Sequence, residues 1–436
     1  MPKPAPVYAF AAIDFGTSNS AIVVPNAAGA MALVELEPGF RTAPTAVFYR
    51  ADVSEFGPEP WRWYGRAAVA AYVDGLDGRL MRSLKSILGS TLVEQRTDVG
   101  GGRGATYREI IAGYLRHLKT TAERQSGQTL TQLVLGRPVF FVDGDPERDA
   151  RAQSVLEDAA RQVGFRDVMF QFEPIAAALD HERSVRAEQL VLVADIGGGT
   201  SDFSLVRVGP GRGARLDRKG DILANHGVHL AGTDFDRHIE LMSVLPLLGY
   251  RTLGPPRPGE QPREVPSPVY FDLATWHLIN TVYAPARVAE LRSLRSWYAD
   301  AQQHQRLMTV VEQRLGHALA AAAEQAKIDV ATRGDALIDL NLVEPGLATR
   351  LIERDAAASI EPDIARIVTA AGETARLAGI ANDQVDALYF TGGSTGFAPL
   401  VKRIAAGFPR AEQRHGDRFA SVAAGLGVYA KVLYGR

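Results

Sequence analysis

Two stretches of the chain share one pattern, in which an apolar run is interrupted by turn-forming residues and then resumes. The first runs from Tyr8 to Val24, is rich in Val, Ile, Ala and Phe, and holds Gly16-Thr17-Ser18-Asn19 in its middle. The second begins at Gln189 and reads QLVLVADIGGGTSDFSLVRV. Because β-branched and aromatic residues favour strands while Gly, Ser, Thr and Asn favour turns, each stretch predicts two strands joined by a tight hairpin.

The two stretches align with each other residue by residue. Asp14-Phe15-Gly16 falls on Asp195-Ile196-Gly197, and the second strands, 21–24 and 203–206, also coincide, roughly 180 residues apart. The repeats of solenoid proteins are far shorter than this. The sequence therefore predicts a duplicated domain.

Elements of both kinds alternate along the rest of the chain. Residues 107–125 and 146–163 have helical spacing of apolar positions, and the second is followed by the apolar run FRDVMFQF. Residues 253–268 contain six prolines and predict an extended excursion. We further expect long helices at about 273–298 and 303–331, a strand at 385–390, a turn at 391–394, and helices at about 400–406 and 420–433. Such alternation predicts an α/β fold.

Composition narrows the class of protein. The 436 residues are 46% hydrophobic, which suits two or three domains. The 48 Lys and Arg nearly balance the 50 Asp and Glu, so we expect neither nucleic acid nor a membrane as a partner. The lack of cysteine excludes disulfides and thiolate metal sites. No apolar run is long enough to span a bilayer, and the segment before Asp14 lacks a signal-peptide pattern, so we expect a cytoplasmic protein.

The hairpins have the chemistry of a phosphate site. Glycine lets backbone N–H groups approach a ligand closely, and Thr and Ser hydroxyls add donors. Asp14 and Asp195 stand where the hairpins begin, and a carboxylate there can hold Mg²⁺ through its water ligands. A single turn of this kind is typical of an ordinary β-turn, but its repetition favours phosphate binding. The predicted phosphate-binding residues are Gly16, Thr17, Ser18 and Asn19 in the first hairpin and Gly197, Gly198, Gly199 and Thr200 in the second.

Two other phosphate motifs are excluded. The chain contains no Gly-Lys dipeptide and hence no Walker A loop. Residues 425–430 match the dinucleotide fingerprint loosely, but we expect them inside a helix rather than between a strand and a helix.

Four motifs in order resemble the nucleotide-binding domain of the DnaK-type heat-shock chaperones, most closely their short YegD-like relatives. AIDFGTSNS is similar to the first phosphate motif, VADIGGGTSDFS to the second, FEPIAAAL to the segment linking the lobes, and FTGGSTG to the adenosine motif. The similarity extends to RTAPT at 41–45, LKSILG at 84–89, HLAGTDFD at 229–236 and EQAK at 324–327.

The resemblance implies a two-lobed actin-like ATPase fold of the α/β class, with duplicated ribonuclease-H-like subdomains around a central nucleotide cleft. Lobe I would span residues 1–188, with an upper insertion at 41–119. Lobe II would span 189–399, with an upper insertion at about 232–329. The C-terminal segment 400–436 would return to lobe I.

The resemblance also assigns roles in ATP and Mg²⁺ binding. Thr17, Ser18 and Thr200 would contact phosphate, and Asp14 and Asp195 would hold hydrated Mg²⁺. Two more residues would be catalytic: Lys85 would position the attacking water, and Glu173 would be the remaining carboxylate beside it. Without the resemblance, Lys85 is typical of a surface lysine and Glu173-Pro174 of a helix start.

The nucleoside end of the site departs from the family. The resemblance gives contacts there to Gly232, Glu324, Lys327, Gly392, Gly393 and Ser394. The two arginines with which the family sandwiches adenine fall on Ile328 and Gly396. Losing each stacked guanidinium costs on the order of 1 kcal/mol, so we expect weaker and less selective binding of ATP or ADP.

Three functions remain open from the sequence. The first is a slowly ATP-hydrolysing, chaperone-like switch whose closure is read by a protein partner or client, without a peptide-clamping domain of its own. The second is a nucleotide-sensing scaffold that does not hydrolyse ATP. The third is a small-molecule kinase of the sugar or acetate type, for which Glu173 is the one spare base. Aromatic residues after the proline-rich stretch would suit such a protein partner if exposed, although their helical spacing favours the core: Tyr270, Trp276, Tyr283, Trp297 and Tyr298.

Overall fold

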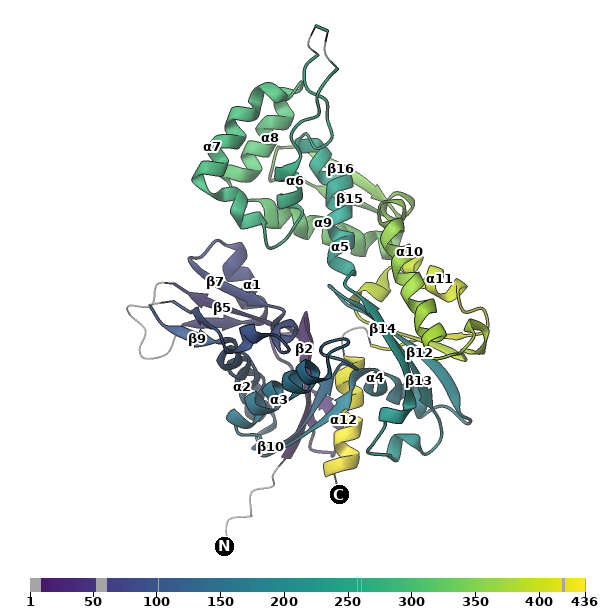
Figure 1. The fold of residues 1–436 in the computed structure, drawn as a ribbon. Coiled ribbons are helices and arrows are strands. Elements are labelled where there is room, and N and C mark those ends of the chain that lie inside the picture. The colour runs from purple at the N-terminus through teal and green to yellow at the C-terminus, as the bar shows by residue number, and fades with distance from the viewer. Residues whose placement is uncertain are drawn as a thin grey trace.

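The computed structural model describes residues 9–51, 61–100, 102–256, 258–259, 261–417 and 420–435, without the side chain of Asp180. Residues 1–8, which enter the expectation of a missing signal peptide, lie outside this range. Figure 1 shows two bodies, each built on one large sheet and each carrying an extension on the same side of the molecule. The elements built on the first sheet are called lobe I below, and those on the second lobe II. None of the helices in the described ranges is long and apolar enough to cross a bilayer.

The first sheet has the strand order β3-β2-β1-β10-β11. The pairs β1·β2 and β2·β3 are antiparallel, whereas β10 runs parallel to β1 and β11 parallel to β10. Helices α2 and α3 pack on one face, and a capping box between Thr106 and Glu109 begins α2. The bounds are β1 Ala9–Phe15, β2 Asn19–Pro25, β3 Met31–Leu33, β4 Ala43–Pro44, β10 Leu130–Arg137, β11 Asp167–Phe172, α2 Tyr107–Ser126 and α3 Pro146–Gln162.

The second sheet repeats the first. Its order is β14-β13-β12-β17-β18, with antiparallel pairing up to β12 and parallel pairing from β12 to β18. Identical order and direction confirm the duplication predicted from the two hairpins. The bounds are β12 Gln189–Ile196, β13 Ser201–Val208, β14 Ile222–Val228, β17 Ala387–Thr391, β18 Glu412–His415, α5 Gly232–Ile239, α10 Glu353–Leu377 and α11 Ala398–Ala406.

Two helices fill the space between the sheets. In Figure 1, α12 (Ser421–Tyr434, yellow) lies alongside α4 (Glu173–Glu182) and β10, and residues of both sheets share one apolar core with these helices. A Cβ at Gly425 would lie 1.9 Å from the Ala176 carbonyl oxygen, so only glycine permits this helix contact. The loose dinucleotide match at 425–430 is therefore helix packing, as its predicted helical context indicates.

The extension of lobe I is a small three-stranded sheet with one helix. Its strand order is β6-β5-β7, and α1 packs against β5. Lys85 follows directly, on a short 3₁₀ turn. The bounds are β5 Ala46–Arg50, β6 Arg62–Tyr64, α1 Gly65–Val73, β7 Gly78–Arg82, the 3₁₀ turns Leu84–Ile87 and Thr91–Glu94, β8 Arg96–Asp98 and β9 Gly104–Thr106.

The extension of lobe II corrects one prediction, because the two long helices expected at 273–298 and 303–331 are broken into shorter ones. Pro285 begins a new helix, and Arg314 adopts a left-handed φ of 57° between the second pair of helices. The Gly316 N–H, at the start of the next helix, donates to the Tyr283 hydroxyl at 2.9 Å. Of the aromatic residues, Tyr270 and Tyr298 are buried. The bounds are a π-helical turn Glu240–Val244, α6 Pro268–Leu273, α7 Pro285–Ser293, α8 Ala301–Glu312, α9 Gly316–Arg333, β15 Asp335–Asp339, β16 Ala348–Ile352 and 3₁₀ turns Leu245–Leu248, Ile279–Tyr283 and Leu294–Trp297.

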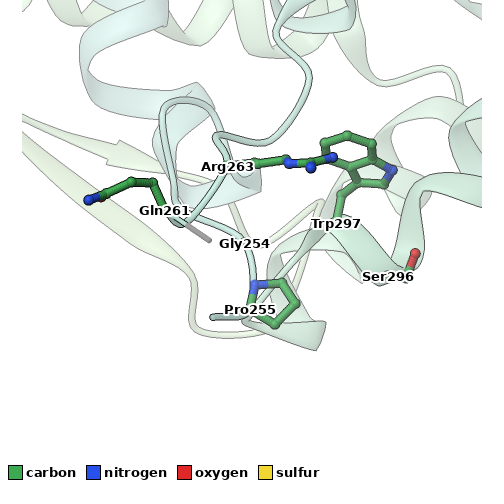
Figure 2. Close-up of a pocket in the computed structure, with 6 residues that line it drawn as sticks. All are labelled: Gly254, Pro255, Gln261, Arg263, Ser296 and Trp297. Atoms are coloured by element: carbon green, nitrogen blue, oxygen red, sulfur yellow. The ribbon is translucent and has the colours of Figure 1, made fainter. Parts of the chain in front are cut away.

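The proline-rich excursion projects from this extension, as expected, with one isolated bridge between Leu253 and Glu264. A small pocket lies at its base, and Figure 2 shows the Arg263 side chain reaching to the Trp297 indole there. A Cβ at Gly254 would lie 2.6 Å from the Trp297 carbonyl oxygen, which fixes glycine at this approach. The pocket residues include no carboxylate and none of the predicted site residues, so this pocket belongs to the packing of the excursion.

Candidate functional site

The first hairpin is braced from lobe I. The Thr45 hydroxyl donates to the Gly16 carbonyl at 2.8 Å, and the Thr45 N–H donates to the Ser18 carbonyl at 2.9 Å. A Cβ at Gly16 would lie 2.2 Å from the Asn19 carbonyl oxygen, so the turn requires glycine there. The hairpin is therefore held in one conformation by residues behind it.

The second hairpin is braced from lobe II. The Gly197 N–H donates to the Thr200 carbonyl at 2.9 Å and closes the turn. The Ser394 hydroxyl donates to the Gly197 carbonyl at 2.6 Å, and the Thr233 N–H donates to the Gly198 carbonyl at 2.8 Å. Since the C=O and the following N–H of a trans peptide point in opposite directions, the N–H groups of Gly198 and Gly199 point away from these partners.

The two hairpins meet across the lobes. A Cβ built on Gly198 would lie 3.1 Å from the Ser18 hydroxyl, whereas one built on Gly199 meets no atom within 4 Å. Gly198 thus lies against the first hairpin, while the position beside Gly199 is open. A ligand with several anionic oxygens fits this arrangement of backbone N–H groups and hydroxyls.

An ion pair lies beside the hairpins. Lys85 Nζ is 2.5 Å from Glu173 Oε1, and the two side chains are only 10% and 16% exposed. Burial alone would lower the pKa of Lys85, but Glu173, Asp14 and Asp195 together raise it. Glu173 is also the first residue of α4, so the helix start expected from Glu173-Pro174 is confirmed.

Asp14 and Asp195 approach the same lysine. Burial raises the pKa of Asp14 to about 8, with Glu173 and Asp195 adding to the shift and Lys85 opposing it. Burial likewise raises the pKa of Asp195 to about 7, assisted by Asp202 and Glu173. The fold therefore gathers more negative charge than one ammonium can balance.

Asp202 is a site residue that the sequence prediction missed. It lies opposite Asp195 in the β12–β13 register, and burial and Glu173 raise its pKa while a hydrogen bond with Thr200 lowers it. Its side chain is still accessible to solvent, so this position is recessed rather than enclosed. In the first hairpin Ala21 lies opposite Asp14, so the second carboxylate is a difference between the two repeats.

The carboxylates fit a hydrated divalent cation. Asp14, Glu173, Asp195 and Asp202 surround one Lys, and oxygen ligands with excess negative charge suit Mg²⁺, which keeps much of its water. Among the described residues, no three acidic or imidazole side chains are placed to ligate a metal directly.

Three of the predicted nucleoside residues lie together: Gly232, Lys327 and Ser394. A Cβ at Gly232 would lie 2.4 Å from the Ser394 hydroxyl and 3.6 Å from Lys327 Nζ, and Lys327 Nζ donates to the Gly232 carbonyl at 3.3 Å. Gly392 has a φ of 87°, and a Cβ there would lie 2.4 Å from the Ile196 carbonyl oxygen, so glycine is required. Gly393 begins the 3₁₀ turn Gly393–Gly396 that follows.

Asp236 is a second residue that the prediction missed in this part of the site. Its carboxylate is 2.6 Å from Lys327 Nζ, and burial raises its pKa to about 6 while Lys327 lowers it. Lys327 is therefore held by lobe II before any ligand arrives. Ile328, the next residue, is 48% exposed, so an apolar side chain lies on the surface beside Lys327.

The extensions of the lobes also touch above the hairpins. Tyr72 of α1 stacks on Trp276 at 5.1 Å between ring centroids, and His317 of α9 packs edge-on against both rings. The Arg82 guanidinium lies 4.3 Å from the Trp276 ring centroid and within electrostatic reach of Glu324. Figure 1 shows α1 and β7 facing α6 and α9 at this junction.

A duplicated sheet of this order, with a hairpin from each sheet meeting between two lobes, is the actin-like ATPase fold. The model of one family within this class, described as Hsp70 protein, matches residues 10–244, which is more than half of the chain. The chain belongs to the Hsp70 family. Its general function is accordingly ATP binding of the chaperone type, and members of the family bind ATP or ADP together with Mg²⁺.

The family match covers one part of the candidate site and not the rest. It covers both hairpins, Lys85, Glu173 and Gly232. It does not reach Glu324, Lys327 or the segment 392–394, so the roles proposed for these residues rest on the geometry around Gly232 and on the motif resemblance.

Proposed function

We propose that this protein is a Mg·ATP-dependent conformational switch that hydrolyses ATP slowly and passes its closure to a protein partner. The observation that carries the proposal is the buried Lys85–Glu173 pair, which lies beside the two aspartates of the facing hairpins. Phosphoryl transfer to water needs mainly positioning and electrostatic stabilisation, and this site supplies both.

Phosphate binding would use the two hairpins. The N–H groups of Gly198 and Gly199, with the Thr17, Ser18 and Thr200 hydroxyls, would hold the phosphate chain. Asp14 and Asp195 would hold Mg²⁺ through water. The cation would neutralise charge on the phosphate oxygens when bound. Burial is the main cause of the raised pKa of both aspartates and neighbouring carboxylates add to it, and the charge of the cation would offset that added repulsion.

Hydrolysis would depend on Lys85. Its ammonium orients the attacking water and stabilises negative charge on the γ-phosphate in the transition state, while Glu173 holds the ammonium in place. Glu173 accepts the Lys85 hydrogen bond and is thus engaged as a positioning group. This engagement disfavours the small-molecule kinase, which would need Glu173 as the base for an acceptor hydroxyl.

Closure would follow from a ligand that contacts both lobes. Ser18 belongs to lobe I and Gly198 to lobe II, so a phosphate chain between them favours the closed arrangement. The contact of Tyr72 with Trp276 adds to that arrangement from above. A partner protein that prefers one arrangement would then respond to the nucleotide state, and we propose a cytoplasmic client for it.

A non-hydrolysing scaffold is the second candidate. It is favoured by the exposed Ile328, which cannot stack on adenine as a guanidinium does. Both candidates predict ATP binding, and they differ in turnover.

The test is an ATP titration with Mg²⁺ by calorimetry, together with phosphate release. Lys85→Ala should bind ATP within a few-fold of wild type and hydrolyse it about 100-fold more slowly. Lys119→Ala is the matched control, because Lys119 is also largely buried and paired with a glutamate, Glu123, at 2.6 Å, but lies on α2. Binding without turnover by wild type would select the scaffold, and no binding at millimolar ATP would refute both.

A further inference from the structure

We propose that Arg137, at the end of β10, is a positioning residue for the Lys85–Glu173 pair. It acts through the segments that lie next to each member of the pair. The inference rests on the proposed hydrolysis, but it concerns a residue to which neither the motif resemblance nor the repeat assigns a role. Arg137 is 13% exposed in its side chain and lies on the side of β10 where α3 begins. Its contacts lead to both members of the pair.

The guanidinium of Arg137 donates four hydrogen bonds. Its Nε donates to the Pro138 carbonyl at 3.0 Å, and one terminal nitrogen donates to the Val139 carbonyl at 3.2 Å and to the Asp149 carboxylate at 2.9 Å. The other terminal nitrogen donates to the Gln153 amide oxygen. A planar fork with five N–H groups can make these contacts together, whereas an ammonium cannot.

The first connection leads to Glu173. Arg137 lies opposite Phe172 in the β10–β11 register, and its guanidinium carbon is 5.2 Å from the centroid of that ring. Phe172 directly precedes Glu173 and is the N-cap of α4, where no side chain caps the helix. The neighbouring Gly136 leaves room for Glu173, because a Cβ there would lie 3.3 Å from Glu173 Oε1. Arg137 thus contacts Phe172, which fixes the backbone directly before Glu173.

The second connection leads to Lys85. The loop that Arg137 closes is also bound at Phe141, whose N–H donates to Asp149 at 2.6 Å and whose ring centroid is 5.2 Å from the guanidinium. Val142, the next residue, packs against Gly89, where a Cβ would lie 2.2 Å from its Cγ2 atom. Gly89 lies two residues after the 3₁₀ turn that carries Lys85.

These two connections make one support for a pair whose members are 88 residues apart in sequence. Arg137 holds β11 to β10 on the Glu173 side and holds the 138–142 loop on the Lys85 side. Without it, Glu173 Oε1 and Lys85 Nζ would lose their fixed separation of 2.5 Å. A misplacement of about 1 Å is sufficient to slow an enzymatic step on the order of 100-fold.

The experiment uses the full chain with Arg137→Met, which keeps the apolar stem, and Arg137→Lys, which keeps the charge. Arg306→Met is the matched control, since the Arg306 side chain is 17% exposed and donates hydrogen bonds to the Glu344 carboxylate and the Leu247 carbonyl in lobe II. We expect both Arg137 variants to lower single-turnover hydrolysis on the order of 10- to 100-fold, with ATP affinity changed less than about threefold. Arg137→Lys should not rescue the rate, because the fork is lost.

A readout without nucleotide separates this inference from the proposed function. Acetylation of the free protein by acetic anhydride at one pH, followed by mass spectrometry, reports how well Lys85 is sheltered by its partner, with Lys119 as the internal reference. We expect the ratio of Lys85 to Lys119 modification to rise several-fold in both Arg137 variants and to stay unchanged in Arg306→Met. This holds even if wild type proves not to hydrolyse ATP.

The double variant Lys85→Ala with Arg137→Met gives the final discrimination. If Arg137 acts through Lys85, hydrolysis in the Lys85→Ala background should not fall further when Arg137 is replaced. Variants that lower only the melting temperature, with hydrolysis and Lys85 modification unchanged, would refute the positioning role. If Arg137→Met does not fold, Arg137→Lys carries the same comparison.

Discussion

Asp195 and Asp202 lie directly opposite each other across the antiparallel pair β12–β13, at the mouth of the second hairpin. The two carboxylates repel each other when both are ionised, and this repulsion adds to the burial that raises the pKa of Asp195 to about 7. The pKa of Asp14, in the first hairpin, is raised to about 8, chiefly by burial. In the metal-free protein, these groups bind protons more tightly when folded than when unfolded.

The metal-free protein should therefore lose stability as the pH rises from about 4 to about 8. An unfolded Asp has a pKa of about 3.9, so over this range the folded state holds protons that the unfolded state has released. Each such proton changes the free energy of unfolding by at most about 1.4 kcal/mol per pH unit. Thermal melts in EDTA between pH 5.5 and 8.5 should show the melting temperature falling, and Asp14→Asn should flatten that slope.

Magnesium should reverse this trend, because it competes with those protons. Its stabilising effect is expected to be larger at pH 8 than at pH 6. Asp335→Asn, which changes an exposed carboxylate of β15, is the control and should keep the wild-type slope. A melting temperature of metal-free wild type that is constant or rises over this range would contradict the prediction.

A second prediction concerns Gly199, at the tip of the second hairpin. Gly199→Ala should leave stability within about 0.5 kcal/mol of wild type, since a Cβ there meets no atom within 4 Å. The same methyl group would occupy the open space assigned to phosphate, so ATP affinity should fall by a factor of about 10 or more. Calorimetric titration and chemical denaturation measure the two quantities. Gly220→Ala, an equally open position in lobe II, should change neither. Undiminished ATP affinity in Gly199→Ala would place the phosphate elsewhere.

The contact between the lobe extensions predicts an effect on nucleotide release. Trp276→Ala removes the ring that stacks on Tyr72 and lies under Arg82. Such aromatic contacts contribute about 0.5–1.5 kcal/mol, so bound nucleotide should dissociate about two- to tenfold faster. Stopped-flow displacement of a fluorescent ATP analogue measures this rate. Trp297→Ala is the control, since Trp297 packs against Arg263 in the same extension (Figure 2). Equal dissociation rates in wild type and Trp276→Ala would show that this contact does not retain the nucleotide.

Stability should depend strongly on Arg218. This arginine is 3% exposed and makes two hydrogen bonds of 2.9 Å to Glu182, at the end of α4, and an ion pair with Asp221. Arg218→Met leaves the buried Glu182 carboxylate without its cation, while Asp221 keeps its ion pair with Arg212. Breaking a buried pair in this way typically costs about 3–5 kcal/mol. Urea denaturation should show this loss. Arg350→Met breaks an exposed pair with Asp335 and should cost less than about 1 kcal/mol. Similar losses in both variants would contradict the prediction.

Much of the fold followed from local pattern. The hairpin strands, the helices at 107–126 and 146–162, the last helix and the α/β class are all confirmed. The long helices expected between 273 and 331 are wrong, because their apolar spacing continues through breaks that Pro285 and the left-handed Arg314 impose. Helical spacing records which face is buried, and it does not record where the chain turns.

The residues of the candidate site also differ in whether the sequence could predict them. The repeated Asp and glycine turn could be found in the sequence because a hairpin is local, and its chemistry lies within about ten residues. Asp202 and Asp236 lie within quoted motifs, VADIGGGTSDFS and HLAGTDFD, whereas Arg137 lies in none. The roles of all three depend on side chains from distant segments. Lys85 and Glu173 were named by resemblance, and only folding brings them within 2.5 Å of each other.

The sequence by itself determined two phosphate-type hairpins, each entered by an aspartate, because backbone conformation and turn chemistry are fixed by neighbouring residues. The tertiary structure alone decided that these hairpins face each other, that four carboxylates share one lysine, and that Tyr72 meets Trp276 above them. Burial and the distance between charges set the electrostatics of such a site, and both quantities exist only after the two sheets, α4 and α12 have packed together.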